Sequence, residues 1–283
     1  IKWSRGDNEM AEPRLGDTTV QYELMFGRQA MARIRAFPVG YLPIGCPERH
    51  GDHLPMGLDA IKAHRVCCRV AEALGGTVFP PHHYAGIHAM TEEQLRKYTG
   101  EWGNLYTDAT AEAHLLDVVH QIARTGIRTL ILYSGHYPGC QVEMLERIRQ
   151  QARKDFGIRV VPFCESMIIS GDHAGLTETS FLLAVAPELV DMTRIGPENF
   201  ADHGWSEEKS PLKASRERGE ADIHPVEEID HVAEDEKRDE PPRGLGHRRM
   251  RRFALIHACP RRSPSALGLW ISHRNGLRGQ VRR

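Results

Sequence analysis

Short apolar runs with the character of strands alternate along this chain with longer segments that have helical periodicity. The strands are expected at residues 36–45, 77–79, 128–133 and 159–164, and the helices at 22–35, 60–74, 110–125, 141–156 and 177–186. A helix between two successive strands allows them to pair in parallel. The pattern therefore predicts an α/β fold, with a mostly parallel, doubly wound sheet flanked by helices. Ligands of such sheets bind at the carboxyl ends of the strands.

The length of 283 residues, with 40% hydrophobic and 27% charged residues, suits one sizeable domain with appendages. We predict an N-terminal arm at 1–20, a main domain at 21–220 and a charged C-terminal extension at 221–283. No run approaches 18 apolar residues, so no membrane partner is expected. The six cysteines form no CxxC pair, and the sequence does not start like a secretory leader. A reducing, cytoplasmic location is the expected one.

The net charge of −1 conceals two C-terminal stretches of opposite charge. Residues 206–240 carry 13 acidic and 6 basic side chains, whereas residues 243–283 carry 11 arginines and no acidic residue. Such stretches are typical of interaction segments or disordered tails. Nothing beyond charge indicates a nucleic-acid partner, and none is expected.

Carboxylates and imidazoles gather directly after the first predicted strand. Glu48, His50 and His53 lie within six residues, and Asp59 follows eleven residues after Glu48. Such side chains next to a buried strand favour a divalent cation, and imidazole with carboxylate suits zinc, manganese or iron. The two oxygens of Asp59 could bridge two ions. The alternative is a solvated loop in which Asp59 caps the helix predicted at Ala60.

Two more polar loops follow later predicted strands. His136 lies between glycines after the strand that ends at Tyr133, where a tight turn would direct the imidazole toward the sheet edge. His173 and Glu178 flank the helix start predicted at Thr177, where the helix dipole favours a carboxylate. Taken singly, these are as well explained by a turn histidine and an ordinary helix start. The three loops together supply three histidines and three carboxylates, enough for a one- or two-metal hydrolytic centre.

These loops resemble the signatures of the creatininase family. Residues 42–45 (LPIG) followed by 48–59 (ERHGDHLPMGLD) are similar to its first signature. Residues 134–137 (SGHY) resemble its Asn-Gly-His loop, and residues 173–180 (HAGLTETS) resemble its His-Ala-Gly and Glu-Thr-Ser signature. The resemblance covers about residues 37–220. Its first and last motifs are specific, because several fixed spacings agree at once.

The resemblance implies a creatininase-like hydrolase with one or two divalent ions, zinc or manganese before iron, in a homo-oligomer that is often a hexamer. Asp59 would bridge the ions, Glu178 would bind metal or carry protons, and His173 would be the catalytic histidine. The residues implied as metal ligands are Glu48, His50, Asp59, His136 and Glu178. The metal would lower the pKa of water, which then attacks a small cyclic amide or a related carbonyl compound.

The substrate itself is left open by the sequence. Creatininase has a glutamate two residues after the loop histidine, where this chain has Pro138, which argues against creatinine and leaves the number of ions open. Residues 82–106 are rich in histidine and aromatic residues and form either a substrate loop or a surface lid or subunit contact. The candidate substrate contacts are Tyr137, His83, Tyr84 and Trp102.

Two other functions fit the same residues. One is a hydrolase of this fold that opens a carbocyclic ring ketone, such as an oxidised cyclitol (a dehydro-inosose), by C–C cleavage. The other is a metal-binding scaffold without catalysis, which failure to bind any divalent metal would favour.

Overall fold

The computed structural model describes residues 18–99, 103–169, 171–225 and 256–257. Trp102, most of the predicted arm at 1–20 and most of the predicted extension at 221–283 lie outside the described residues. The domain boundaries therefore stay predictions.

Four parallel strands form the central sheet, in the order β2-β1-β3-β4. Their bounds are β1 Val39–Ile44, β2 Thr77–Val78, β3 Thr129–Ser134 and β4 Arg159–Phe163. Val39 pairs with Thr129 and Ile44 with Ser134, so β1 and β3 end at the same level. The loops that follow these two central strands therefore leave the sheet side by side.

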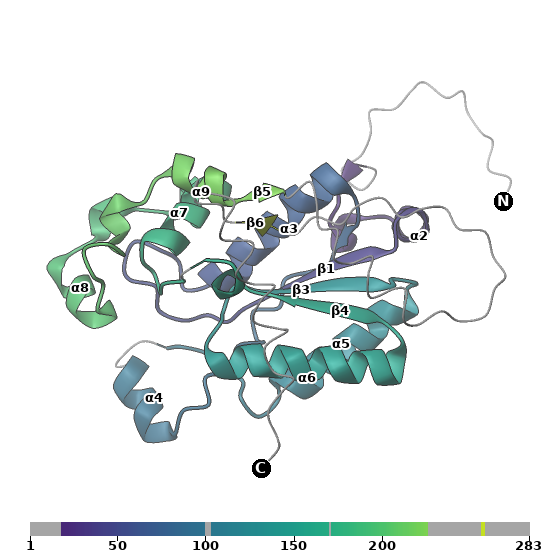
Figure 1. Ribbon diagram of the computed structural model, residues 1–283, viewed down its shortest axis with the longest axis horizontal. Helices are drawn as coiled ribbons and strands as arrows, with labels where there is room; N and C mark the ends of the chain where they lie inside the picture. Colours follow the sequence, from purple (N-terminus) through teal and green to yellow (C-terminus); the bar gives the residue numbers. More distant parts are fainter. Residues whose placement is uncertain (1–17, 100–102, 170, 226–255, 258–283) are drawn as a thin grey trace, which may run out of the picture.

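Helices cover both faces of the sheet (Figure 1). The helices are α2 Gly27–Ala36, α3 Leu58–Leu74, α4 Glu92–Thr99, α5 Ala111–Arg124, α6 Gly139–Phe156, α7 Leu176–Val185, α8 Pro197–His203 and α9 Arg216–Asp222. One face packs against α5 and α6, and the other against α3 and α7. This arrangement confirms the predicted α/β fold with a parallel sheet flanked by helices.

The alternation of side chains along the strands builds these two cores. In β1, Leu42 and Ile44 are buried with α5 and α6, whereas Val39 and Tyr41 are buried with α3 and α7. All six residues of β1 are buried, as expected for a central strand covered on both faces. The continuous apolar run in the sequence is thus explained by burial on both sides.

Some elements differ from the prediction. The helix expected at 22–35 is divided into a 3-10 turn, Tyr22–Leu24, and α2, because Met25 and Phe26 adopt extended backbone conformations. The short helices α4, α8 and α9 were not predicted. Within the predicted extension, β6 (Ile256–His257) pairs antiparallel with β5 (His224–Pro225).

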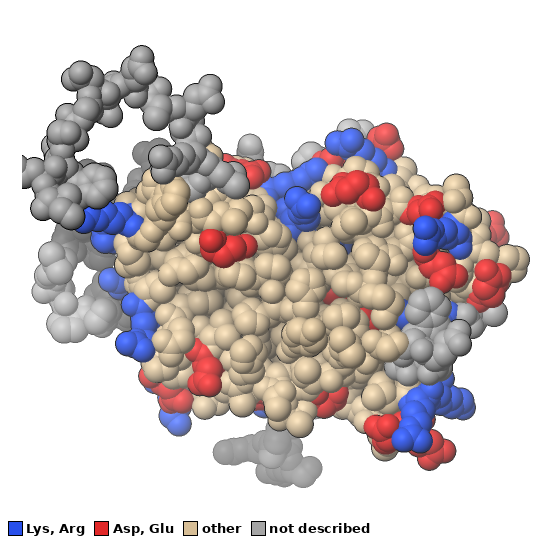
Figure 2. Space-filling model, turned by 180° about the vertical axis from the view of Figure 1, so that it is seen from behind, with Lys and Arg blue, Asp and Glu red and all other residues tan. Residues whose placement is uncertain are grey.

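The surface charge and the lengths of the helices bear on the partners expected from the sequence. On the face shown in Figure 2, acidic and basic side chains are interspersed near the rim, and neither sign forms a broad area of its own. Among the described residues, no helix combines the length and apolarity needed to span a bilayer.

Candidate metal centre

The predicted metal-binding side chains meet at the carboxyl edge of the sheet. Glu48 and His50 follow β1, and His136 follows β3, while Asp59 lies in the first turn of α3. Glu178 lies in the first turn of α7. All five are buried. The parallel register of β1 and β3 brings the first three together, and the starts of two helices add the carboxylates.

Glycines let the loops approach α3 closely. A side-chain carbon at Gly135 would overlap the backbone carbonyl of Asp59, and one at Gly45 would overlap the Asp59 side chain. Neither position has space for a Cβ atom. The absence of side chains at the ends of β1 and β3 thus places Asp59 within reach of both loops.

One group of donors surrounds the Oδ2 atom of Asp59. His136 Nδ1 lies 2.9 Å from Glu48 Oε1 and 3.5 Å from Asp59 Oδ2. Cys46 Sγ lies 3.7 Å from the same Oδ2 atom. The four donor atoms of Cys46, Glu48, Asp59 and His136 all lie within 4.8 Å of one another, and all four residues are buried.

A second group surrounds the other oxygen of Asp59. His50 Nε2 lies 3.2 Å from Asp59 Oδ1 and 3.6 Å from Glu178 Oε2. These three residues also have donor atoms within 4.8 Å of one another. Asp59 therefore belongs to both groups and presents one oxygen to each.

Backbone carbonyls fix the orientation of both imidazoles. His50 Nδ1 lies 3.0 Å from the carbonyl of Glu48, and His136 Nε2 lies 3.0 Å from that of Ile87. A carbonyl only accepts, so the nitrogen that faces it carries the proton. The opposite nitrogen of each neutral ring then directs a lone pair into the cluster, as in histidines that bind metals.

The cluster contains buried polar atoms that have no hydrogen-bond partner. His50 Nε2 and Asp59 Oδ1 are both buried, and although 3.2 Å apart they do not have hydrogen-bond geometry. Two lone pairs that face each other in a buried site are unfavourable unless a cation or a proton lies between them. Imidazole nitrogen and carboxylate oxygen are donors for zinc, manganese and iron, so the residues present fit a divalent ion.

The charges in the cluster depend on one another. Burial alone would lower the pKa of His50, but Asp59, Glu178 and Glu48 together raise it to about 9. Burial would raise the pKa of Glu178, but Lys62 and His50 lower it to about 2. The cluster thus carries negative charge that attracts either protons on the histidines or a metal cation.

The sequence and fold are similar to those of characterised proteins. A sequence model of the creatininase family, described as creatinine amidohydrolase, matches residues 24–228. This chain belongs to the creatininase family. It is 30% identical over 178 residues to the creatinine amidohydrolase of Pseudomonas putida. This match covers 54% of this chain and 66% of that protein. It is 31% identical over 175 residues to the mycofactocin precursor peptide peptidase of Mycobacterium ulcerans (strain Agy99). This match covers 58% of this chain and 65% of that protein. The matched segments span just under two thirds of these relatives.

Solved structures of creatininases have the same fold. A manganese creatininase superimposes with a TM-score of 0.54 at 28% identity, and a mutant creatininase of the Zn–Zn type with a TM-score of 0.53 at 26% identity. Each comparison covers 72% of this chain and 92% of the other chain. The predicted creatininase-like fold is thereby confirmed.

In this member of the creatininase family, a buried lysine on α3 forms an ion pair with Glu178. Lys62 Nζ donates to Glu178 Oε1 at 2.9 Å and to Glu165 Oε2 at 2.8 Å. Glu165 also accepts from the Tyr133 hydroxyl, and its burial raises its pKa to about 7. The Ala174 N–H donates to Glu178 Oε2 at 2.8 Å. Lys62 and Glu165 were not identified from the sequence, because they belong to no recognisable motif.

His173 lies beside the cluster and is partly open to solvent. Its Nε2 lies 2.7 Å from the carbonyl of Arg49, so Nε2 carries the proton, and its Nδ1 lies 3.9 Å from Glu48 Oε1. Its ring centroid is 4.6 Å from that of His50, and 34% of its side chain is exposed. The Trp205 indole donates to the His173 carbonyl at 2.7 Å. The structure thus places the candidate catalytic histidine between the cluster and solvent.

The predicted substrate contacts are not all at the cluster. The Tyr137 hydroxyl lies 3.1 Å from Glu178 Oε1. His83 lies beside Gly57, directly before the turn of α3 that carries Asp59, whereas Tyr84 is 61% exposed. Trp102 lies outside the described residues.

Two other residues of the 82–106 loop lie close to the donors. The Tyr106 hydroxyl donates to Glu48 Oε2 at 2.6 Å. The ring centroid of His88 is 5.2 Å from that of Tyr106 and 6.0 Å from that of His136. The amino-acid composition indicated residues 82–106 as a possible substrate loop. No motif in the sequence distinguishes His88 and Tyr106 from the neighbouring histidine and aromatic residues.

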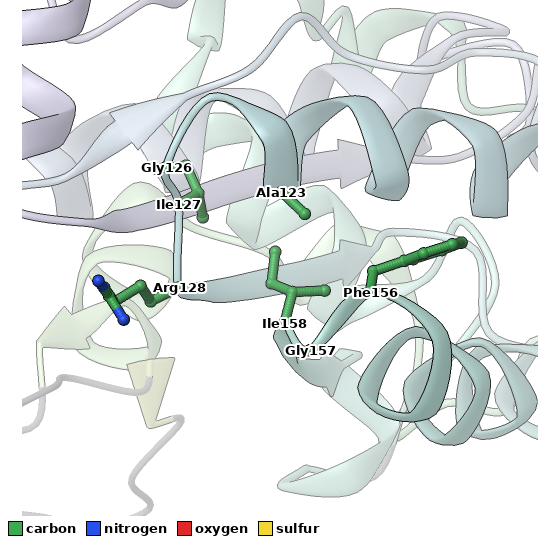
Figure 3. A pocket seen from close by; sticks show the side chains of 7 residues that line it. All are labelled: Ala123, Gly126, Ile127, Arg128, Phe156, Gly157 and Ile158. Atoms are coloured by element: carbon green, nitrogen blue, oxygen red, sulfur yellow. The ribbon is translucent and has the colours of Figure 1, made fainter.

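A surface hollow lies at the opposite end of the sheet. It has a volume of about 250 Å³. Figure 3 shows its lining residues, which come from the ends of α5 and α6 and from the turns that precede β3 and β4. No carboxylate or histidine is among them, so the hollow has no donors for a metal and is separate from the candidate centre.

Proposed function

We propose that this chain is a metal-dependent hydrolase that acts on a small cyclic amide or a related carbonyl compound. The observation that carries the proposal is the pair of buried donor groups that share Asp59, together with the unpartnered His50 Nε2 and Asp59 Oδ1 atoms that face each other in the second group. Membership of the creatininase family supports it, and so do the zinc and manganese in the names of similar structures.

The residues that would hold the metal are Glu48, His50, Asp59, His136 and Glu178. A divalent ion bound by them supplies Lewis acidity and lowers the pKa of water toward neutrality. Lys62 keeps Glu178 ionised and holds its carboxylate in place. His173 can donate or accept a proton through Nδ1, since Nε2 is occupied by the Arg49 carbonyl.

We propose that the bond cleaved is the C–N bond of an amide rather than a C–C bond of a ring ketone. Hydrolysis of an amide needs a proton on the leaving nitrogen, and the partly exposed His173 is positioned to carry one. Cleavage of a C–C bond in a ring ketone would instead need stabilisation of a carbanion. The location of His173 beside the donors favours the amide.

Metal content of the purified protein tests the proposal, measured by inductively coupled plasma mass spectrometry. We expect about one to two equivalents of zinc, manganese or iron in the wild type. Asp59→Ala should lose most of this metal together with hydrolytic activity on a panel of lactams, peptides and cyclic ketones. Asp117→Ala, at an exposed position on α5, is the matched control and should retain both. Less than a tenth of an equivalent in wild type, even after metal supplementation, would contradict a metal-dependent hydrolase.

A further inference from the structure

Cys46 lies inside the candidate centre, although no sequence motif identified it as a ligand. It follows β1 by two residues, and its side chain is fully buried. Its sulfur lies 3.7 Å from Asp59 Oδ2, on the side of Asp59 that also faces His136. Glu48, Asp59, His136 and Cys46 thus form a four-donor group with one sulfur, two carboxylates and one imidazole.

Gly86 packs against Cys46 and leaves room for its thiol beside Asp59. A side-chain carbon at Gly86 would overlap both the sulfur and the Cβ atom of Cys46, so the glycine leaves the space that the thiol fills. The backbone on either side of the cysteine is hydrogen-bonded as well, because Gly45 N–H donates to the His82 carbonyl at 3.0 Å and Leu105 N–H donates to the Pro47 carbonyl at 2.8 Å. These contacts hold the loop that carries the thiol in place beside Asp59.

The separations between donors suit ligands of a single ion. Two ligands of a tetrahedral zinc, bound at their usual lengths, lie ~3.5 Å apart. Cys46 Sγ to Asp59 Oδ2 is 3.7 Å and His136 Nδ1 to the same oxygen is 3.5 Å. In the other group, the unpartnered Asp59 Oδ1 faces the equally unpartnered His50 Nε2, which independently favours a cation bound at Asp59.

We propose that Cys46 is a thiolate ligand of one ion, which it binds together with Glu48, Asp59 and His136. This inference rests on the proposed metal centre and adds a ligand to it. On binding, the S–H bond breaks, the sulfur lone pair coordinates the ion, and the proton is released to solvent. The other group, His50, Asp59 and Glu178, has only nitrogen and oxygen donors. The two halves of the centre therefore differ chemically.

This difference determines which metals each half prefers. A thiolate favours zinc, cobalt or iron over manganese, whereas nitrogen and carboxylate donors accept manganese as well. We expect zinc in the half with Cys46 even when manganese is present in excess.

Cobalt(II) is the probe for the test, because a sulfur–cobalt bond gives a charge-transfer band in the near ultraviolet, separate from the visible d–d bands. Metal-free protein titrated with cobalt should show both. In Cys46→Ser and Cys46→Ala the charge-transfer band should disappear while visible d–d absorption remains. Cys164→Ser is the matched control, since Cys164 is a buried thiol outside the donor groups, and it should keep the band.

The outcomes separate the inference from the proposed function. Visible cobalt bands without a charge-transfer band in the wild type would overturn the thiolate ligand but leave the metal centre standing. A charge-transfer band that survives in both Cys46 variants would assign it to another cysteine and overturn the inference as well. Absence of any cobalt absorption would overturn the metal centre and the inference together. Far-ultraviolet circular dichroism of each variant establishes that it is folded.

Discussion

At the residue scale, three side chains of the candidate centre are held, by hydrogen bonds with atoms outside the donor groups, in the orientation in which they face the cluster. His50 and His136 are held by backbone carbonyls, and Glu178 by Lys62 and the Ala174 N–H. The donors are thus oriented before any ion binds, which reduces the entropic cost of binding.

The first prediction concerns His173. His173→Ala should leave the metal content unchanged and lower kcat by at least about 10²-fold, because proton transfer by a positioned side chain contributes 10²–10⁴-fold. Metal analysis and steady-state kinetics on the same preparation measure the two effects. His203→Ala, which removes a neighbouring ring, is the comparison. A His173→Ala variant with near-native rates would show that the catalytic assignment is wrong.

Lys62 gives a prediction about stability. Lys62→Met should lower the free energy of unfolding by about 3–5 kcal/mol, because two buried carboxylates lose their cation. Arg65→Met, one turn along α3, removes an exposed pair with Glu188 and should cost less than about 1 kcal/mol. Urea denaturation of the metal-free proteins compares them. Equal effects would mean that Lys62 does not compensate the buried charges.

The predictability of these residues from the sequence is uneven. Glu48, His50 and Asp59 lie close together in the chain, so their spacing alone indicates a common site. Lys62 and Glu165 are 103 positions apart, and their pairing depends on how α3 packs against the end of β4. Lys62 lies on the buried face of an amphipathic helix, and local periodicity does not reveal the partner that allows a charge there.

At the scale of elements, the centre is built where helices begin. The first turns of α3 and α7 supply Asp59 and Glu178, and a carboxylate is favoured at the positive end of a helix dipole. The amphipathic pattern of its 17 residues predicted α3, whereas α7 was predicted from a ten-residue, mostly apolar run that ends before Pro187. The short α4, α8 and α9 were missed, since helices of seven or eight residues contain too few turns to show a period.

The close approach of the β3 loop to α3 gives a third prediction. Gly135→Ala should reduce metal content several-fold, because its Cβ would overlap the Asp59 carbonyl and displace the start of α3. Gly139→Ala, at the start of α6, meets no atom within 4 Å and should keep full metal content. Mass spectrometry of the metal and the melting temperature of both variants provide the comparison. Wild-type metal content in Gly135→Ala would contradict the role of this contact.

At the scale of the whole molecule, stability without metal should depend on pH through groups with raised pKa values. The fold raises the pKa of His50 from 6.5 to about 9, and that of Glu165 from 4.5 to about 7. A raised pKa means that the fold stabilises the protonated form. This contribution is fully present below the unfolded-state pKa and is lost as pH rises through the folded-state pKa.

The fourth prediction follows from these signs. Metal-free protein should melt at a lower temperature at pH 9 than at pH 7. Between these values the histidines whose pKa burial lowers, such as His53, are mostly neutral in both the folded and unfolded states and contribute little. Glu178, with a pKa lowered to about 2, contributes equally at both values and does not alter the comparison. Added zinc should stabilise the protein more at pH 9, because its ligands must be deprotonated to bind. Differential scanning fluorimetry with a chelator or with zinc measures both trends. Metal-free protein that is more stable at pH 9 would contradict the assigned protonation of the cluster.

The two donor groups become complete at different points of protein synthesis. The group with Cys46 ends at His136, whereas the group with His50 also needs Glu178. A ribosome delivers the chain from the N-terminus, so a nascent chain contains β1, β3 and the first group before α7 exists. We therefore expect the ion beside Cys46 to be acquired first, and α7 to close the second half of the centre around an ion already in place.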